Sequence, residues 1–211
     1  MRLLPFAVLA YLVTAIVWPT WRTWRRAGVF PVVFHREAET AQRVVGALLG
    51  LFLAGLVVWS LLCASLEPGR LGIWQLAPGW QALGWLLFLG GLIVTLVAQA
   101  QMGASWRVGI DDRPTLLVTG GLFALSRNPI FLGMFLTLAG LVLITPAPWT
   151  VVGLAAAVIL VSLQVRLEER NLVRMHGPEY AAYAARVGRF VPWLGRLRPR
   201  GGPGPATSGA A

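Results

Sequence analysis

Five long apolar runs constrain what this chain can fold into more than any other feature. A helix needs about 20 apolar residues to cross the ~30 Å hydrocarbon layer of a membrane, because each residue adds about 1.5 Å. The second and third runs are long enough to span that layer, and the last two runs lie close together in the sequence. The sequence therefore predicts an all-α, polytopic membrane protein with about five transmembrane helices. The runs cover residues 3–18, 44–66, 83–100, 130–145 and 149–167.

Composition supports a membrane environment. Hydrophobic residues make up 57% of the 211 residues and charged residues only 12%, against about 45–50% and 25% in soluble domains. A surplus of this size must face lipid, and it excludes a disordered chain or a collagen-like fibre. The single cysteine, Cys63, excludes a fold held together by internal disulfides.

The chain divides into three regions. Residues 1–100 hold three of the predicted spans, residues 101–198 hold the other two and most of the polar motifs, and residues 199–211 are expected to be a disordered tail rich in Gly and Pro. The segment Pro146-Ala147-Pro148 is so short that the last two spans must form a tight helical hairpin. A short cytoplasmic helix is expected near the carboxyl terminus, beginning at Gly177 and Pro178.

The arginines predict how the protein sits in its membrane. The net charge is +10, from 18 basic and 8 acidic residues, and the arginines gather in alternate connections between spans. The positive-inside rule then places the amino terminus outside and the carboxyl terminus in the cytoplasm. A basic charge often indicates nucleic-acid binding, but orientation in the membrane is the simpler explanation for these arginines. The first run is expected to be a retained helix that ends at Trp18, because an aromatic Trp18–Trp21 anchor follows it in place of a cleavage site.

Three clusters of polar residues lie on the predicted cytoplasmic side. In the first, Asn128 and Pro129 have the chemistry of a helix start, with Asn128 as the N-cap. With Arg127 beside it, that start suits an anionic group such as a carboxylate. Gly121 permits close approach of a ligand, and Gly133 leaves room for a ligand or a neighbouring helix. The alternative is an ordinary capped transmembrane helix with a basic flank.

The second cluster is the pair Glu168 and Glu169 at the end of the fifth run. On a helix these carboxylates point about 100° apart, so they cannot act together as a close pair. One of them can accept hydrogen bonds from two ribose hydroxyls while the other pairs with an arginine. The alternative is a solvated helix end neutralised by Arg166 and Arg170.

The third cluster begins at His176, and Tyr180 and Tyr183 follow on one face of the predicted short helix. That helix either covers a site or lies on the membrane surface with its arginines toward lipid headgroups. No metal site is predicted, because His176 and His35 each lack a second ligand at a usable spacing. No GxGxxG motif follows a strand, which excludes a soluble Rossmann-type enzyme.

The order of these clusters resembles the isoprenylcysteine carboxyl methyltransferase family, part of a wider group that includes phospholipid methyltransferases. The resemblance covers about Gly103 to Trp193. It rests on Leu-Val-Thr-x-Gly at 117–121, Ser-Arg-Asn-Pro-x-x-x-Gly at 126–133, the double glutamate, His-Gly-x-x-Tyr at 176–180 and Arg-Phe-Val-Pro at 189–192. The family commonly has His where this chain has Asn128.

The resemblance implies an enzyme that uses S-adenosylmethionine and works at the cytoplasmic end of its last two spans, with residues 101–198 as the catalytic region. It implies a lipophilic methyl acceptor, a carboxylate being favoured, and a bacterial inner membrane as the location. Arg127 and Arg189 are expected to orient the acceptor. The residues expected to hold the cofactor are Gly121, Arg127, Asn128, Pro129, Gly133, Glu168, Glu169, His176, Tyr180 and Tyr183.

Three other functions stay open at this stage. The acceptor of the same reaction can be a phospholipid amine or a thiol. A membrane reductase that uses NADPH shares a similar motif, although Ile130-Phe131 and Gly133-Met134 differ from the residues usual in that class. A membrane protein of the same ancestry without catalytic activity is the last. The sequence predicts no oligomeric state.

Overall fold

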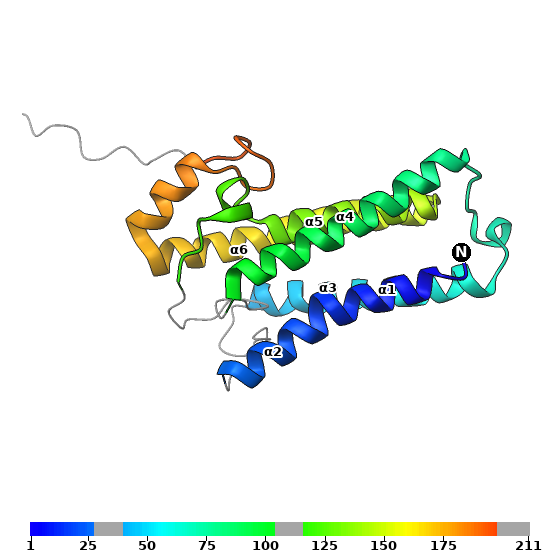
Figure 1. The fold of residues 1–211 in the computed structure, drawn as a ribbon, viewed down its shortest axis with the longest axis horizontal. Helices are drawn as coiled ribbons and strands as arrows, with labels where there is room; N and C mark the ends of the chain where they lie inside the picture. Colours follow the sequence, from blue (N-terminus) through cyan, green and yellow to red (C-terminus); the bar gives the residue numbers. More distant parts are fainter. Residues whose placement is uncertain (28–39, 104–115, 198–211) are drawn as a thin grey trace, which may run out of the picture.

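The computed structural model describes residues 1–27, 40–103 and 116–197, so the expected tail at 199–211 lies outside the described residues. Helices dominate these parts (Figure 1). Their bounds are α1 Leu4–Leu12, a π-helical turn Val13–Val17, α2 Trp18–Ala27, α3 Thr40–Ser65, a 3₁₀ turn Pro68–Leu71, α4 Pro78–Met102, a 3₁₀ turn Gly121–Ala124, α5 Pro129–Ile144 and α6 Pro148–Arg186.

Five apolar helical stretches confirm the predicted all-α class. Four are long and apolar enough to cross a membrane: Leu4–Arg25, α3, α4 and α6, while α5 is a shorter apolar helix. Large hydrophobic side chains such as Leu51, Leu86 and Phe6 are about 70% exposed. Such outward-facing surface suits lipid and not water.

The first helix continues past its expected end. We predicted an end at Trp18, but α1, the π-helical turn and α2 follow one another without a break to Ala27. Pro19 lies inside this helix and has no N–H, so it cannot donate to the carbonyl of Ala15 one turn earlier. The π-helical turn just before Pro19 accommodates this interruption. The expected end was therefore wrong, because a proline does not always stop an apolar helix in a membrane.

Glycines bring α4 and α5 into close contact. A Cβ atom on Gly91 would lie 2.5 Å from the carbonyl oxygen of Gly133, and one on Gly84 would lie 2.9 Å from the carbonyl oxygen of Gly140. Small residues at such spacing let two helix backbones approach closely inside a membrane. The Thr137 hydroxyl also donates to the Phe88 carbonyl oxygen of α4 at 3.3 Å. The two helices therefore act as one wall of the molecule.

The last two helices form the predicted tight hairpin. α5 ends at Ile144 and α6 begins at Pro148. Thr150 holds the turn together, because its hydroxyl donates to the Thr145 carbonyl oxygen at 2.9 Å. Further along α6, Gly177 has φ +52° and bends the helix, so the segment after Pro178 leaves the line of the bundle (Figure 1). This segment is the predicted short helix.

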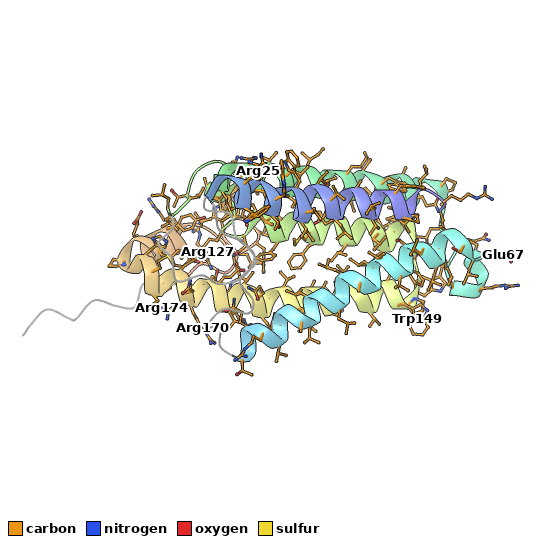
Figure 2. All side chains as sticks on the ribbon, turned by 90° about the horizontal axis from the view of Figure 1, so that it is seen from below. Arg25, Glu67, Arg127, Trp149, Arg170 and Arg174 are labelled. Carbon is orange, nitrogen blue, oxygen red and sulfur yellow. The ribbon has the colours of Figure 1, made fainter. Side chains whose placement is uncertain are left out.

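In Figure 2, α1, α4 and α5 are drawn on one side and α3 and α6 on the other. The two sides are in contact, because α1 packs against α3 and α5 packs against α6. Arg25, Arg127, Arg170 and Arg174 lie toward one end of the bundle, and Glu67 and Trp149 lie at the other end (Figure 2). We call the first end the arginine end. It is formed by the end of α4, the start of α5 and the bend of α6.

Candidate active site

A cavity of about 500 Å³ is lined by residues of α1, α3, α4, α5 and α6. Its walls are mostly apolar over the length of the bundle, and its polar side chains gather toward the arginine end. One carboxylate, Glu168, and one cation, Arg127, are among the described residues that line it. The other polar side chains of its lining are Tyr11, Gln99, Asn128, Thr137, Gln164, Tyr180 and Tyr183.

Arg127 is buried at the edge of this cavity, and every one of its N–H groups has a protein acceptor. Its Nε and Nη2 donate to Glu169 Oε1 at 3.0 and 2.7 Å. Its Nη1 donates to the carbonyl oxygens of Ala184 and Val187 at 2.9 and 2.8 Å, and Nη2 also donates to that of Gly195 at 3.1 Å. A guanidinium has five N–H groups. Arg127 therefore has none left for a ligand in this arrangement.

Glu169 binds a second arginine. Arg189 donates from Nε and Nη2 to Glu169 Oε2 at 3.0 and 2.6 Å. The side chains of Arg127 and Glu169 are 1% and 7% exposed, whereas that of Arg189 is 28% exposed. We call Arg127, Glu169 and Arg189 the ion-pair cluster. It joins the start of α5, the middle of α6 and the segment after α6 into one unit.

Two further hydrogen bonds connect the start of α5 to the segment after α6. The Arg127 N–H donates to the Gly188 carbonyl oxygen at 2.9 Å, and the Asn128 Nδ2 donates to the Arg189 carbonyl oxygen at 3.1 Å. The expectation that the Asn128 side chain caps α5 was wrong. Asn128 occupies the N-cap position, but its side chain makes no capping hydrogen bond, because it bonds the segment after α6 instead.

Glu168, the neighbour of Glu169, faces the cavity. It accepts one hydrogen bond from Gln164 Nε2, at 2.9 Å to Oε1. Gln164 lies one turn earlier on α6 and is 2% exposed, and its own Oε1 is buried without a partner. The two consecutive carboxylates therefore differ: Glu169 is bound by two arginines, and Glu168 offers acceptor positions to the cavity.

The bent end of α6 closes the cavity at the arginine end. Tyr180 and Tyr183 are 1% and 4% exposed, and their rings meet edge to face at 6.0 Å between centroids. The Tyr183 hydroxyl donates to the Phe123 carbonyl oxygen at 2.7 Å. Burial raises the pKa of Tyr183 to about 12, so the phenol stays protonated and keeps this hydrogen bond at neutral pH. The predicted cover over a site is therefore a packed aromatic wall.

The predicted site residues separate into two groups. The structure brings one group to the cavity lining: Arg127, Asn128, Pro129, Glu168, Tyr180 and Tyr183. Gly121, Gly133, Glu169, His176 and Arg189 are not part of that lining. Gly133 contacts α4, and Gly121 has φ +61° beside the Gln101 side chain. Both glycines therefore make contacts within the protein. Gly133 leaves room for a neighbouring helix and not for a ligand, which is one of the two alternatives given for it above.

Sequence reasoning missed the contribution of the first two spans and of two glutamines. α1 and α3 supply Val8, Leu12, Phe52 and Leu53 among others to the cavity lining. Gln99 lines the cavity from α4, and its Oε1 is buried without a partner. Gln99 and Gln164 each lie near the end of an apolar run, and a polar side chain inside a membrane helix is the signal that drew no attention in the sequence.

Comparisons with known proteins agree with this geometry. Residues 80–179 match the family model described as phospholipid methyltransferase. That match includes α4, α5, the Glu168-Glu169 pair and the bend of α6. These residues are therefore similar to the phospholipid methyltransferase-like group of membrane proteins. The suspected resemblance to the isoprenylcysteine carboxyl methyltransferase group is thereby confirmed at the level of the wider group.

Two bacterial proteins with similar sequences are named for methyl transfer. The chain is 30% identical over 83 residues to methanethiol S-methyltransferase of Crocosphaera subtropica, a match that covers 39% of this chain and 32% of that protein. It is 36% identical over 90 residues to methanethiol S-methyltransferase 1 of Bradyrhizobium diazoefficiens, covering 41% and 30%. The matches thus span about a third of the length of each relative.

A solved structure shares the fold. The eukaryotic intramembrane Ras methyltransferase ICMT, an isoprenylcysteine carboxyl methyltransferase, superposes with a TM-score of 0.56 at 16% identity. The superposition covers 90% of this chain and 67% of that one. Since the family match begins only at residue 80, this likeness shows that α1 and α3 also belong to the shared architecture.

Proposed function

We propose that this protein is an integral membrane methyltransferase that uses S-adenosylmethionine and methylates a lipophilic acceptor in the cavity. The observation that carries the proposal is the Glu168 carboxylate at the polar end of an apolar cavity, next to a buried acceptor on Gln164. The match to the phospholipid methyltransferase family supports it. So do the names of the two bacterial relatives.

The residues at the arginine end fit the chemistry of that cofactor. Two acceptors of the lining are available to the cofactor on α6, the Glu168 carboxylate and the Oε1 atom of Gln164, and elsewhere in the lining the Tyr11 hydroxyl is buried without a partner. Adenosine brings ribose hydroxyls that donate hydrogen bonds, and a sulfonium brings a positive charge, so both match a wall of acceptors. Tyr180, Tyr183 and Leu172 supply apolar surface to a purine ring. We propose Glu168 as the residue that binds the ribose hydroxyls.

The protein contributes position and exclusion of water. When bound, S-adenosylmethionine supplies an electrophilic methyl group, and the electron pair of the broken carbon–sulfur bond stays with its sulfur. Glu168 and Gln164 of α6 hold the cofactor, and the apolar side chains of α1, α3 and α5 hold the lipophilic acceptor. Such positioning supplies much of the rate in reactions that need no covalent enzyme intermediate.

Arg127, Glu169 and Arg189 are positioning residues in this proposal. The ion-pair cluster fixes α5 and the end of α6, and through them Asn128, Glu168 and Tyr180, which line the cavity. We had expected Arg127 and Arg189 to orient a carboxylate acceptor. The geometry gives that finer assignment no support, because the Arg127 N–H groups are all bound and Arg189 is not part of the lining.

The proposal extends to the arrangement in the membrane. We propose that the arginine end faces the cytoplasm of a bacterial cell, as the positive-inside rule predicts, and that the amino terminus lies outside. Cytosolic S-adenosylmethionine then reaches Glu168 from the cytoplasmic side of the membrane. The acceptor enters from the bilayer, with which the exposed apolar faces are in contact. Residues 101–198 are the proposed catalytic region, with α1 and α3 completing its cavity.

Ligand binding tests the proposed function. The full chain, purified in detergent, is titrated calorimetrically with S-adenosylhomocysteine and, in a separate experiment, with NADPH. We expect micromolar affinity for S-adenosylhomocysteine and no heat with NADPH. Binding of NADPH alone would make the protein a reductase, and binding of neither by folded protein would make it a non-catalytic member of the group.

A further inference from the structure

The part of the cavity away from Glu168 is walled by α1, α3 and the α4–α5 pair. We propose that it receives an uncharged acceptor, a thiol on an apolar chain, and that Gln99 accepts a hydrogen bond from the S–H group. The inference rests on the proposed methyl transfer and names the acceptor class of the same site.

Gln99 is held in one orientation by the first helix. Its Nε2 donates to the Ala15 carbonyl oxygen at 2.7 Å. Pro19 cannot supply the helical N–H that would otherwise reach that carbonyl, so the side chain from α4 takes this role. The amide is thereby fixed, and its Oε1 is left buried, without a partner, in the cavity wall. A buried acceptor without a donor is unfavourable, and a ligand with one donor relieves it.

The charges of the lining select against ionised acceptors. Arg127 is the one cation among the described lining residues, and each of its N–H groups is bound to protein. An acceptor carboxylate would be buried there without a free cation. The partnerless Tyr11 hydroxyl can donate one hydrogen bond but brings no charge, so burial of the carboxylate stays unfavourable. An alkyl amine is protonated at neutral pH and has no free electron pair for the reaction.

Among neutral nucleophiles, a thiol needs the least help. Glu168 is the one carboxylate of the described lining, and no histidine lines the cavity among those residues. A hydroxyl needs a strong base to become a nucleophile, whereas a thiol is more acidic than an alcohol and its sulfur is more nucleophilic. In the transfer, the thiol sulfur bonds to the methyl carbon as the carbon's bond to the donor sulfonium breaks. The donor becomes a neutral thioether, and the thiol proton passes to water.

The length of the cavity suits a chain behind the thiol. Its lining on α5 runs from Pro129 to Leu141, which is about 18 Å at 1.5 Å per residue. Gln99 lies on the last turn of α4, at the arginine end. Val8, Leu56 and Leu141 continue the lining away from that end with apolar side chains, and Tyr11 and Thr137 are the polar residues of the lining next to them. A thiol near Gln99 therefore has its chain directed along an apolar channel.

Matched eight-carbon acceptors test this inference. The full chain in nanodiscs is saturated with S-adenosylhomocysteine and titrated with 1-octanethiol or with octanoate, and methyl transfer to each is measured with S-adenosylmethionine. We expect octanethiol alone to bind and to be methylated. Binding or methylation of octanoate in preference would overturn the thiol assignment while the proposed function stands. Failure of S-adenosylhomocysteine itself to bind would overturn both.

Gln99→Leu tests the assigned contact, and Gln42→Leu is its control. Gln42 is also buried in a membrane helix and has a partnerless Nε2, but it is not part of the cavity lining. Loss of one hydrogen bond should raise the KM for octanethiol about tenfold in Gln99→Leu. The Kd for S-adenosylhomocysteine should stay within about twofold of the parent value, and Gln42→Leu should change neither. An unchanged KM in a folded Gln99→Leu protein would remove Gln99 from the acceptor site.

Discussion

Glu168 and Glu169 are consecutive residues with opposite surroundings. Glu169 is 6% exposed, and two arginines bind both of its oxygens. Glu168 has one amide donor from Gln164 and lines the cavity. The same contrast separates the ion-pair cluster, where donors and acceptors are matched, from the cavity wall, where acceptors are left over. Matched polar groups in a membrane protein hold helices together, and unmatched ones are available to a ligand.

The largest expected effect comes from breaking the matched region. Glu169→Gln removes the charge that neutralises Arg127, whose side chain is 1% exposed. An uncompensated buried charge costs about 3–5 kcal/mol, so the purified variant should unfold well below the parent temperature in detergent. Glu179→Gln, at an exposed carboxylate, is the control and should unfold with the parent. Equal unfolding temperatures for all three proteins would show that the cluster does not hold the helices.

A second prediction concerns the close packing of α4 against α5. Gly91→Ala places a methyl group 2.5 Å from the Gly133 carbonyl oxygen, whereas a Cβ on the adjacent Gly90 meets nothing within 4 Å. Overpacking of this kind costs about 1–3 kcal/mol. Thermal unfolding should therefore shift in Gly91→Ala and not in Gly90→Ala. Equal unfolding temperatures for the two variants would mean that α4 and α5 do not pack closely at Gly91 and Gly133.

The smallest predicted effect comes from Tyr183, which lines the cavity close to the ion-pair cluster in the sequence. Tyr183→Phe removes the hydrogen bond to the Phe123 carbonyl oxygen but keeps the buried ring. We expect a loss of about 1 kcal/mol in the free energy of unfolding and no change in S-adenosylhomocysteine affinity beyond about twofold. A large loss of affinity with unchanged stability would instead mean that the hydroxyl binds the ligand.

The sequence predicts the helices of this molecule better than their contacts. The apolar runs, the hairpin at Pro146–Pro148 and the bend at Gly177 follow from local composition and from backbone preferences. The pairing of α4 with α5 and the partners of Arg127 join residues far apart in the chain, and nothing in a single apolar run indicates its partner. Asn128 illustrates this limit, because its local position suggests a cap and a distant carbonyl takes its side chain.

The candidate site was predicted in part for the same reason. The charged residues Arg127, Glu168 and Glu169 stand out in an apolar sequence, but their division into matched and unmatched groups depends on the fold. Gln99 and Gln164 are uncharged and gave no motif. Their importance comes from buried oxygens that face a cavity, which only the packed structure reveals.

The affinity of Glu168→Gln for S-adenosylhomocysteine tests the central claim most directly. Loss of a charged acceptor costs about 1.5–3 kcal/mol of binding, or roughly 10–100-fold in Kd. We predict that loss in calorimetry with an unfolding temperature close to that of the parent, because Glu168 takes no part in the ion-pair cluster. Parent affinity in folded Glu168→Gln protein would contradict the account, since the carboxylate that faces the cavity would then bind nothing.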